Sequence, residues 1–99
     1  MGEVGHVASL FPGEPKEALA DESIYRAVIA SKPPPRRITI GYGAIAAAQQ
    51  VWVLASGAAK VASLRESLAA TGHTPLAQVL RMRSETRILT DIALGTSFP

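Results

Sequence analysis

A histidine near the start of the sequence is the first residue whose type suits chemistry. His6 lies in residues 2–9 (GEVGHVAS), where Gly2 and Gly5 allow backbone to approach a bound group closely. Histidine titrates near neutral pH and accepts a proton from water, as a hydrolytic base must. Ser9 follows three residues later, but no orienting carboxylate accompanies the pair, so the spacing does not indicate a serine nucleophile. On local sequence alone, a structural or simply exposed histidine remains the alternative.

A lysine at the start of an expected helix is the second candidate. Residues 51–55 (VWVLA) predict a buried strand, Gly57 interrupts it, and a helix is expected from Ala58. Such a helix start offers backbone N–H donors and a positive dipole end, and Lys60 adds a point charge there. A cation at this place is electrostatically misplaced unless an anion binds beside it, which favours a phosphate site. The alternative is a lysine on the solvated face of an ordinary helix.

Two further patterns suggest cofactors but lack supporting residues. Residues 41–46 (GYGAIA) have the glycine spacing of a dinucleotide site, yet the next strand ends in Ala55 and Ser56 without the acidic residue that would hold a ribose. These glycines are therefore expected to form a tight strand-to-helix turn. No His, Asp or Glu stands at a metal-ligand spacing, and His73 is expected at the surface in a helix-ending turn. We expect neither a metal nor an organic cofactor.

The elements that must position these residues alternate between strands and helices. Such alternation predicts an α/β protein with a partial doubly wound, largely parallel sheet and flanking helices, because parallel strands need helical crossovers. Thr74-Pro75 is a typical helix start, and Gly72 is suited to end the preceding helix. The expected strands cover residues 24–30, 37–40, 51–55 and 87–92, the expected helices cover residues 44–50, 58–71 and 75–80, and prolines 33–35 form a stiff connector.

Composition limits the class of protein. The 99 residues include no cysteine, 47% apolar and 18% charged side chains, which predicts one unit over residues 1–99 without disulfides. No apolar run of about eighteen residues and no secretory layout is present, so we expect a cytoplasmic protein without a membrane partner. Residues 26–99 are basic, but Arg81, Arg83 and Arg87 lack interleaved aromatic residues, so nucleic acid is not the expected partner.

Several ordered segments together resemble the family of 6-phosphogluconolactonases and glucosamine-6-phosphate deaminases. Residues 2–13 (GEVGHVASLFPG) resemble the lactonase signature GxDGHTASLFPG, and residues 34–40 (PPRRITI) are similar to PPxRITL. The continuation ASLFPG favours the lactonase branch, because the deaminase branch carries an acidic residue shortly after its histidine. Three more segments match: residues 51–60 resemble a strand followed by GxxK, residues 74–77 (TPLA) an LPAS-like helix, and residues 88–93 (ILTDIA) the closing WFLDEAA strand.

The resemblance implies hydrolysis of the ester of 6-phosphogluconolactone, a sugar phosphate of the pentose phosphate pathway, without metal or organic cofactor. It assigns His6 as the general base on water, Lys60 as the group that holds the substrate phosphate, and Gly2 and Gly5 as the residues that shape the loop around the lactone. A deaminase-like isomerase is a further alternative.

Two departures from the family pattern bear on activity. Val4 replaces the motif's Asp, which removes a carboxylate able to orient the histidine ring, and Val7 replaces a hydroxyl-bearing Thr. The chain also matches only the C-terminal half of a full-length member, so we expect an unpaired sheet edge and a homo-oligomer or a complementary chain. Activity is then expected to be weak or incomplete in the chain alone, and the alternative is a non-catalytic remnant that serves as a self-associating module.

Overall fold

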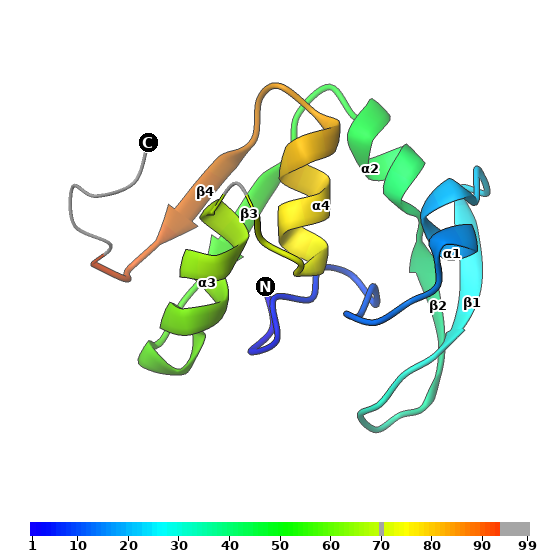
Figure 1. Ribbon diagram of the computed structural model, residues 1–99, viewed down its shortest axis with the longest axis horizontal. Coiled ribbons are helices and arrows are strands. Elements are labelled where there is room, and N and C mark those ends of the chain that lie inside the picture. Colours follow the sequence, from blue (N-terminus) through cyan, green and yellow to red (C-terminus); the bar gives the residue numbers. More distant parts are fainter. Residues whose placement is uncertain (70, 94–99) are drawn as a thin grey trace.

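The computed structural model describes residues 1–69 and 71–93, and it divides into two strand pairs with helices between them (Figure 1). One pair lies beside helix α1 and the other beside helix α3, with helices α2 and α4 in the middle. The elements in chain order are α1 Lys16–Ala20, β1 Tyr25–Ile29, β2 Arg36–Ile40, α2 Tyr42–Ala47, β3 Trp52–Ala55, the 3₁₀ helix η1 Ala58–Lys60, α3 Val61–Leu68, α4 Pro75–Met82 and β4 Arg87–Thr90.

The second pair of strands is parallel, as the sequence predicted. Trp52 pairs with Arg87 and Ala55 with Thr90, and α3 and α4 provide the crossover between β3 and β4. Apolar side chains of β3, α3 and α4 pack together in a core of Val53, Ala55, Leu64 and Leu76. The α/β class with parallel pairing and flanking helices is thus confirmed.

The opposite face of this pair is apolar and exposed. Trp52, Leu54 and Leu89 are 57%, 67% and 48% exposed, so within the described residues the helices cover one face of β3–β4 rather than both. The doubly wound cover that the sequence predicted is therefore one-sided here. In β3 buried and exposed residues alternate, yet the residues on both faces are apolar. Such a strand is suited to a sheet that a second layer covers on its other face.

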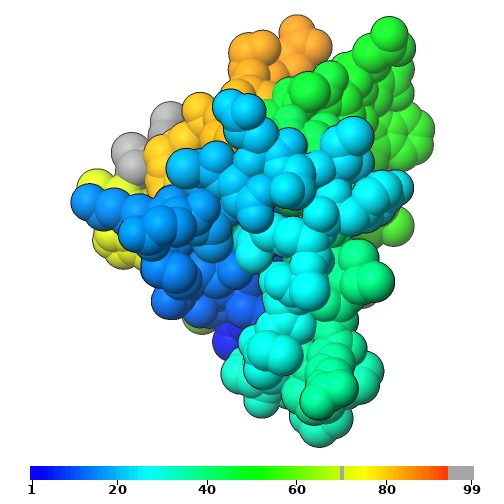
Figure 2. Space-filling view, turned by 90° about the vertical axis from the view of Figure 1, so that its right-hand side faces the viewer, coloured from blue at the N-terminus to red at the C-terminus, as the bar shows by residue number. Residues whose placement is uncertain are grey.

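The first pair is an antiparallel hairpin, where the sequence analysis had expected parallel strands. Tyr25 lies opposite Ile40 and Ile29 opposite Arg36. Only residues 30–35 separate the two strands, which is too short for a helical crossover, so the chain reverses directly. The expected proline connector closes this reversal, with the Ala30 amide donating to the Pro35 carbonyl at 2.7 Å. In Figure 2 the hairpin end projects beyond the body of the molecule at the bottom.

Helix boundaries follow local cap chemistry where it is strong. The Thr74 hydroxyl accepts from the Ala77 amide at 3.1 Å, and Pro75 occupies the first turn, so α4 begins where predicted and continues to Met82. Helix α3 ends at Leu68, before the predicted Gly72, because Ala69 is already extended. Helix α2 spans residues 42–47 where 44–50 was predicted, β4 ends two residues before the predicted Ile92, and α1 was not predicted. No helix among the described residues has the length and apolar character needed to cross a membrane.

Candidate functional site

The histidine loop is held by glycine-dependent turns against the start of α4. The Gly2 amide donates to the His6 carbonyl at 2.9 Å, and the Gly5 amide donates to the Gly2 carbonyl at 3.0 Å. Gly5 has φ +75° and its carbonyl accepts from the Leu76 amide at 3.1 Å. A Cβ on Gly5 would lie 2.6 Å from the Cβ of Thr74, so both conformation and space require glycine there.

The His6 imidazole lies between Gly2 and an aromatic ring. Its ring centroid is 4.7 Å from that of Phe11, with an interplanar angle of 30°. A Cβ on Gly2 would come within 1.8 Å of His6 Cε1, so the absent side chain at position 2 makes the space for the ring. His6 Nδ1 is buried and has no hydrogen-bond partner among the described residues. The other ring nitrogen, Nε2, remains for contact with water.

The surroundings of His6 oppose its protonation. Partial burial lowers its pKa below the ordinary value of 6.5, and four positive charges lower it further, those of Lys32, the amino group of Met1, Arg37 and Lys60. The imidazole is therefore held in its neutral form, the form that accepts a proton. The same charges make the surroundings of the ring attractive to an anion.

Lys60 lies in the turn that leads from β3 into α3. Gly57 has φ +96°, a left-handed conformation that favours glycine, and the one-turn helix η1 follows it directly. The Lys60 amide donates to the Gly57 carbonyl at 3.2 Å, which closes that turn. The positive charge of Lys60 contributes to the lowered pKa of His6, with a smaller effect than the charges of Lys32, the Met1 amino group and Arg37.

An acidic residue already lies at the predicted anion-binding turn. The Asp91 carboxylate accepts from Ser56 Oγ at 2.7 Å and from the Gly57 amide at 3.1 Å. These hydrogen bonds, and the Lys60 charge to a smaller extent, lower the pKa of Asp91. The contact arises because β3 and β4 are parallel, so the residues that follow their carboxyl ends meet at one edge. The sequence patterns did not predict this role of Asp91, although an acidic residue just after a parallel strand is a signal for it.

Two cations near His6 were also missed. Lys32 and Arg37 belong to the hairpin, and neither lies near His6 in sequence. The Arg37 guanidinium carbon is 5.2 Å from the centroid of the Phe11 ring, which itself contacts His6. No local sequence pattern brings these residues together, because the contact depends on how the hairpin folds back over the histidine loop.

The other sequence candidates have structural explanations. A Cβ on Gly41 would lie 2.6 Å from the Ser23 carbonyl oxygen, so close packing against backbone accounts for a glycine there. His73 is exposed, and its amide lies 3.4 Å from a carboxylate oxygen of Glu66. Within residues 1–69 and 71–93, no group of three or more His, Cys, Asp or Glu side chains could hold a metal ion.

The chain is an α/β protein, and comparison with known proteins identifies its family. It is a member of the family described as glucosamine-6-phosphate isomerases/6-phosphogluconolactonase, whose model matches residues 1–89. Among relatives, the 6-phosphogluconolactonase of Streptomyces coelicolor is 35% identical over 100 residues, covering 100% of this chain and 38% of its own length. That of Mycobacterium tuberculosis is 42% identical over 60 residues, covering 61% of this chain and 24% of its own length.

A solved structure gives the same result for the fold. The chain is similar to the 6-phosphogluconolactonase from Trypanosoma brucei with a TM-score of 0.75 and 32% sequence identity. The match covers 91% of this chain and 36% of that one. This chain thus spans little more than a third of the length of such relatives.

Proposed function

We propose that this chain carries the hydrolytic part of a 6-phosphogluconolactonase, a hydrolase of the pentose phosphate pathway, and that its activity alone is weak or incomplete. The observation that supports this most directly is the geometry of the histidine loop, in which the absent side chain of Gly2 makes the space for the His6 ring. Lys60 lies in the 3₁₀ helix η1 that follows Gly57, and its positive charge is one of four that lower the pKa of His6. The relatives that match along the chain bear the name of this enzyme.

In the proposed reaction, His6 Nε2 accepts a proton from water while the water oxygen attacks the lactone carbonyl. The ester C–O bond of the ring then breaks, and the proton returns to the departing ring oxygen. This leaves a carboxylic acid, which releases the second proton of the water to solvent and becomes a carboxylate. Lys60 holds the phosphate, so that attack is effectively intramolecular. Gly2 and Gly5 shape the loop beside the lactone, Gly2 by leaving room for the imidazole. No metal or organic cofactor takes part in these steps.

Lactone hydrolysis is the direct test, measured as the difference between protein and buffer because the lactone also opens spontaneously. His6→Ala should abolish the difference, since general-base help is typically worth about 10²–10⁴-fold. His73→Ala is the matched control and should retain it, because His73 is exposed and has no role in the proposed reaction. Equal activity in the two variants would overturn the assignment of the base.

Phosphate binding tests Lys60 independently of turnover. In an NMR titration with 6-phosphogluconate, the amides of residues 57–60 should shift, and Lys60→Ala should weaken the effect. Lys16→Ala is the control, because Lys16 lies in the acidic first quarter of the chain. Shifts confined to other regions would count against the site. They would favour the second candidate function, a non-catalytic module that associates with itself or with a complementary chain through its exposed apolar face.

The titration also addresses the deaminase-like alternative. Residues 8–13 (ASLFPG) follow the histidine with no acidic side chain, and the same loop packs Phe11 on the imidazole. Leu10 and Phe11 occupy the stretch in which the isomerase branch carries an acidic residue. Binding of glucosamine 6-phosphate tighter than that of 6-phosphogluconate, with release of ammonia, would support the isomerase instead.

A further inference from the structure

One guanidinium in the hairpin connects the proline loop to the histidine ring. Arg37 Nε donates to the Pro34 carbonyl at 2.8 Å, and its Nη2 lies 3.1 Å from each of the carbonyl oxygens of Lys32 and Pro33. Arginine presents five N–H donors in a planar fork, which lets a single side chain contact several carbonyl groups of one loop. Arg37 thereby fixes the backbone that carries Lys32.

The same guanidinium also lies over an aromatic ring. Its carbon is 5.2 Å from the Phe11 centroid, within the range of a cation–π contact. Phe11 in turn lies 4.7 Å from His6. Arg37, Phe11 and His6 therefore form a chain of contacts that runs from the hairpin to the proposed base.

The imidazole has few other restraints. Its Nδ1 makes no hydrogen bond within the described residues, so no polar partner fixes the orientation of the ring. The space left at Gly2 bounds it on one side, and Phe11 contacts it on another. Whatever holds Phe11 in place consequently sets the direction in which Nε2 points.

We propose that Arg37 is a positioning residue of the hydrolytic site: it fixes the Phe11 ring that orients His6, and it holds the loop that carries Lys32 beside that site. This inference rests on the proposed function, because that function supplies the reaction in which His6 acts. The positioning itself concerns the geometry of His6 and is measurable without turnover. Arg37 acts through Phe11 and the loop backbone, and it makes no direct contact with the reacting atoms.

The charges that face His6 give the proposal a second readout. Lys32, Arg37, Lys60 and the amino group of Met1 are all positive and all lower the pKa of His6, Lys32 having the largest effect of the charges. Removal of Arg37 eliminates one of these charges and frees the loop that positions Lys32. The pKa of His6 should therefore rise in Arg37→Ala.

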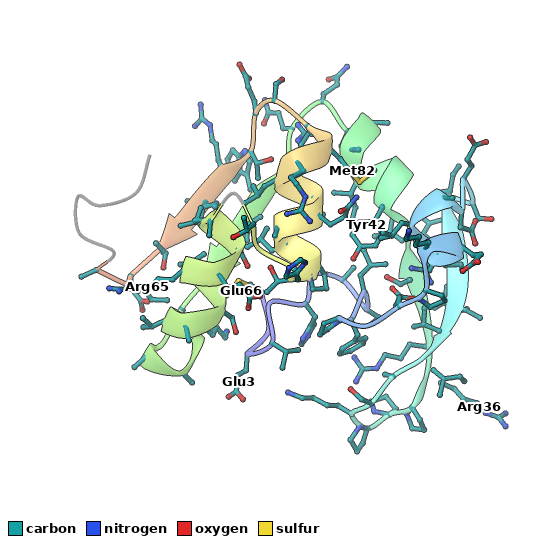
Figure 3. The ribbon with its side chains drawn as sticks, in the orientation of Figure 1. Glu3, Arg36, Tyr42, Arg65, Glu66 and Met82 are labelled. Atoms are coloured by element: carbon teal, nitrogen blue, oxygen red, sulfur yellow. The ribbon has the colours of Figure 1, made fainter. Side chains whose placement is uncertain are left out.

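The neighbouring arginine supplies the matched control. Arg36 belongs to the same strand, is exposed, and extends away from the body of the molecule in Figure 3. Arg36→Ala removes the same side chain one position away and should leave the His6 resonances as they are in the wild type. Arg37→Lys retains a positive charge but lacks the planar fork, so it separates charge from positioning.

The experiment is an NMR titration of the His6 ring protons in the full chain, with circular dichroism to show that each variant is folded. In Arg37→Ala the ring protons should change shift, because Phe11 no longer lies fixed above them, and their pKa should rise. Arg37→Lys should show the same loss of the aromatic shift with a smaller rise in pKa. Where lactone hydrolysis is measurable, kcat should fall by roughly 10-fold to 100-fold in both variants, as for a misplaced group.

Three results would overturn the proposal. One is an unchanged His6 spectrum in Arg37→Ala, another is an equal change in Arg36→Ala, and the third is full retention of the aromatic shift in Arg37→Lys. If Arg37→Ala is unfolded, Arg37→Lys and Phe11→Leu decide, because both must then alter the His6 ring shift. A wild type that neither hydrolyses the lactone nor binds 6-phosphogluconate would reject the proposed function, while the NMR result would still decide the positioning role.

Discussion

Substitution of Gly2 by alanine should disable the site more than it destabilises the fold. The added Cβ would lie 1.8 Å from Cε1, 2.1 Å from Nδ1 and 2.5 Å from Nε2 of His6. Carbon atoms in contact are about 3.5 Å apart, so the ring must move by roughly 1.5 Å or more. The obstructing atoms belong to a side chain, which can rotate while the backbone stays in place. We expect a loss of about 1 kcal/mol in the free energy of unfolding and a fall of about 10²-fold in His6-dependent hydrolysis.

Two other glycines calibrate this expectation with the same chemical change. A Cβ on Gly72 would lie 2.1 Å from the carbonyl oxygen of Glu66, and backbone cannot rotate away as a side chain can. Gly72→Ala should therefore cost about 3 kcal/mol, the upper end for overpacking. Gly43 lies inside α2 with no described atom within 4 Å of its added Cβ, so Gly43→Ala should gain about 0.5–1 kcal/mol.

Urea unfolding followed by circular dichroism measures the three free energies, and the His6 ring resonances report on the site. The order of stability should be Gly43→Ala, wild type, Gly2→Ala and Gly72→Ala, with the His6 spectrum altered strongly only in Gly2→Ala. A Gly2→Ala protein whose ring resonances and hydrolysis match those of the wild type would refute the reasoning. It would mean that the imidazole does not occupy the space beside Gly2.

Three further outcomes are expected. Asp91→Asn should tighten phosphate binding near Lys60 at low salt, because it removes a negative charge that already accepts from Gly57; equal affinity in an NMR titration would contradict this. The chain should self-associate at micromolar concentration in analytical ultracentrifugation, and Leu54→Lys on the exposed face should shift it toward monomer. The pKa of His6 in the folded state lies below its ordinary value of 6.5, so between the folded and unfolded pKa values the unfolded state binds more protons. The free energy of unfolding should therefore fall as the pH drops through this range. Urea titrations should show a smaller dependence on pH in His6→Gln.

The parts of the fold that the sequence predicted are those decided by local chemistry. Thr74 and Pro75 place the start of α4 because a hydroxyl cap and a fixed φ act within one turn. The apolar run that forms β3 is equally local. Pairing between strands is not local, and the antiparallel hairpin was missed because each strand alone suits either direction. The short loop of residues 30–35 was the available signal, since it excludes a crossover.

The site shows the same division. His6 and Lys60 were found because each has an informative neighbourhood of glycines and strand residues. The contacts that modify them come from distant segments: Arg37 reaches Phe11 across 26 positions of the chain, and Asp91 reaches Gly57 across 34. Such pairs form only after the hairpin and the parallel sheet have folded. A carboxylate at the end of a parallel strand is recognisable once the strand order is known. The contacts of Arg37 with Phe11 and of Phe11 with His6 have no sequence signature.

The histidine loop itself explains why position 4 matters for the proposed base. A neutral imidazole that accepts a proton at Nε2 carries its hydrogen on Nδ1, and here Nδ1 is buried without a partner. A buried ring nitrogen without a partner costs about 1–3 kcal/mol whether it is a donor or an acceptor, so no described group favours the tautomer needed for catalysis. The family motif has Asp where Val4 stands, and a carboxylate next to the histidine can orient its ring and stabilise the imidazolium that forms. Val4→Asp should therefore raise the pKa of His6 and increase hydrolysis, whereas Val4→Asn should help less because an amide carries no charge. Absence of any gain in Val4→Asp, in a protein that retains the His6-dependent activity, would place the deficit in substrate contacts instead.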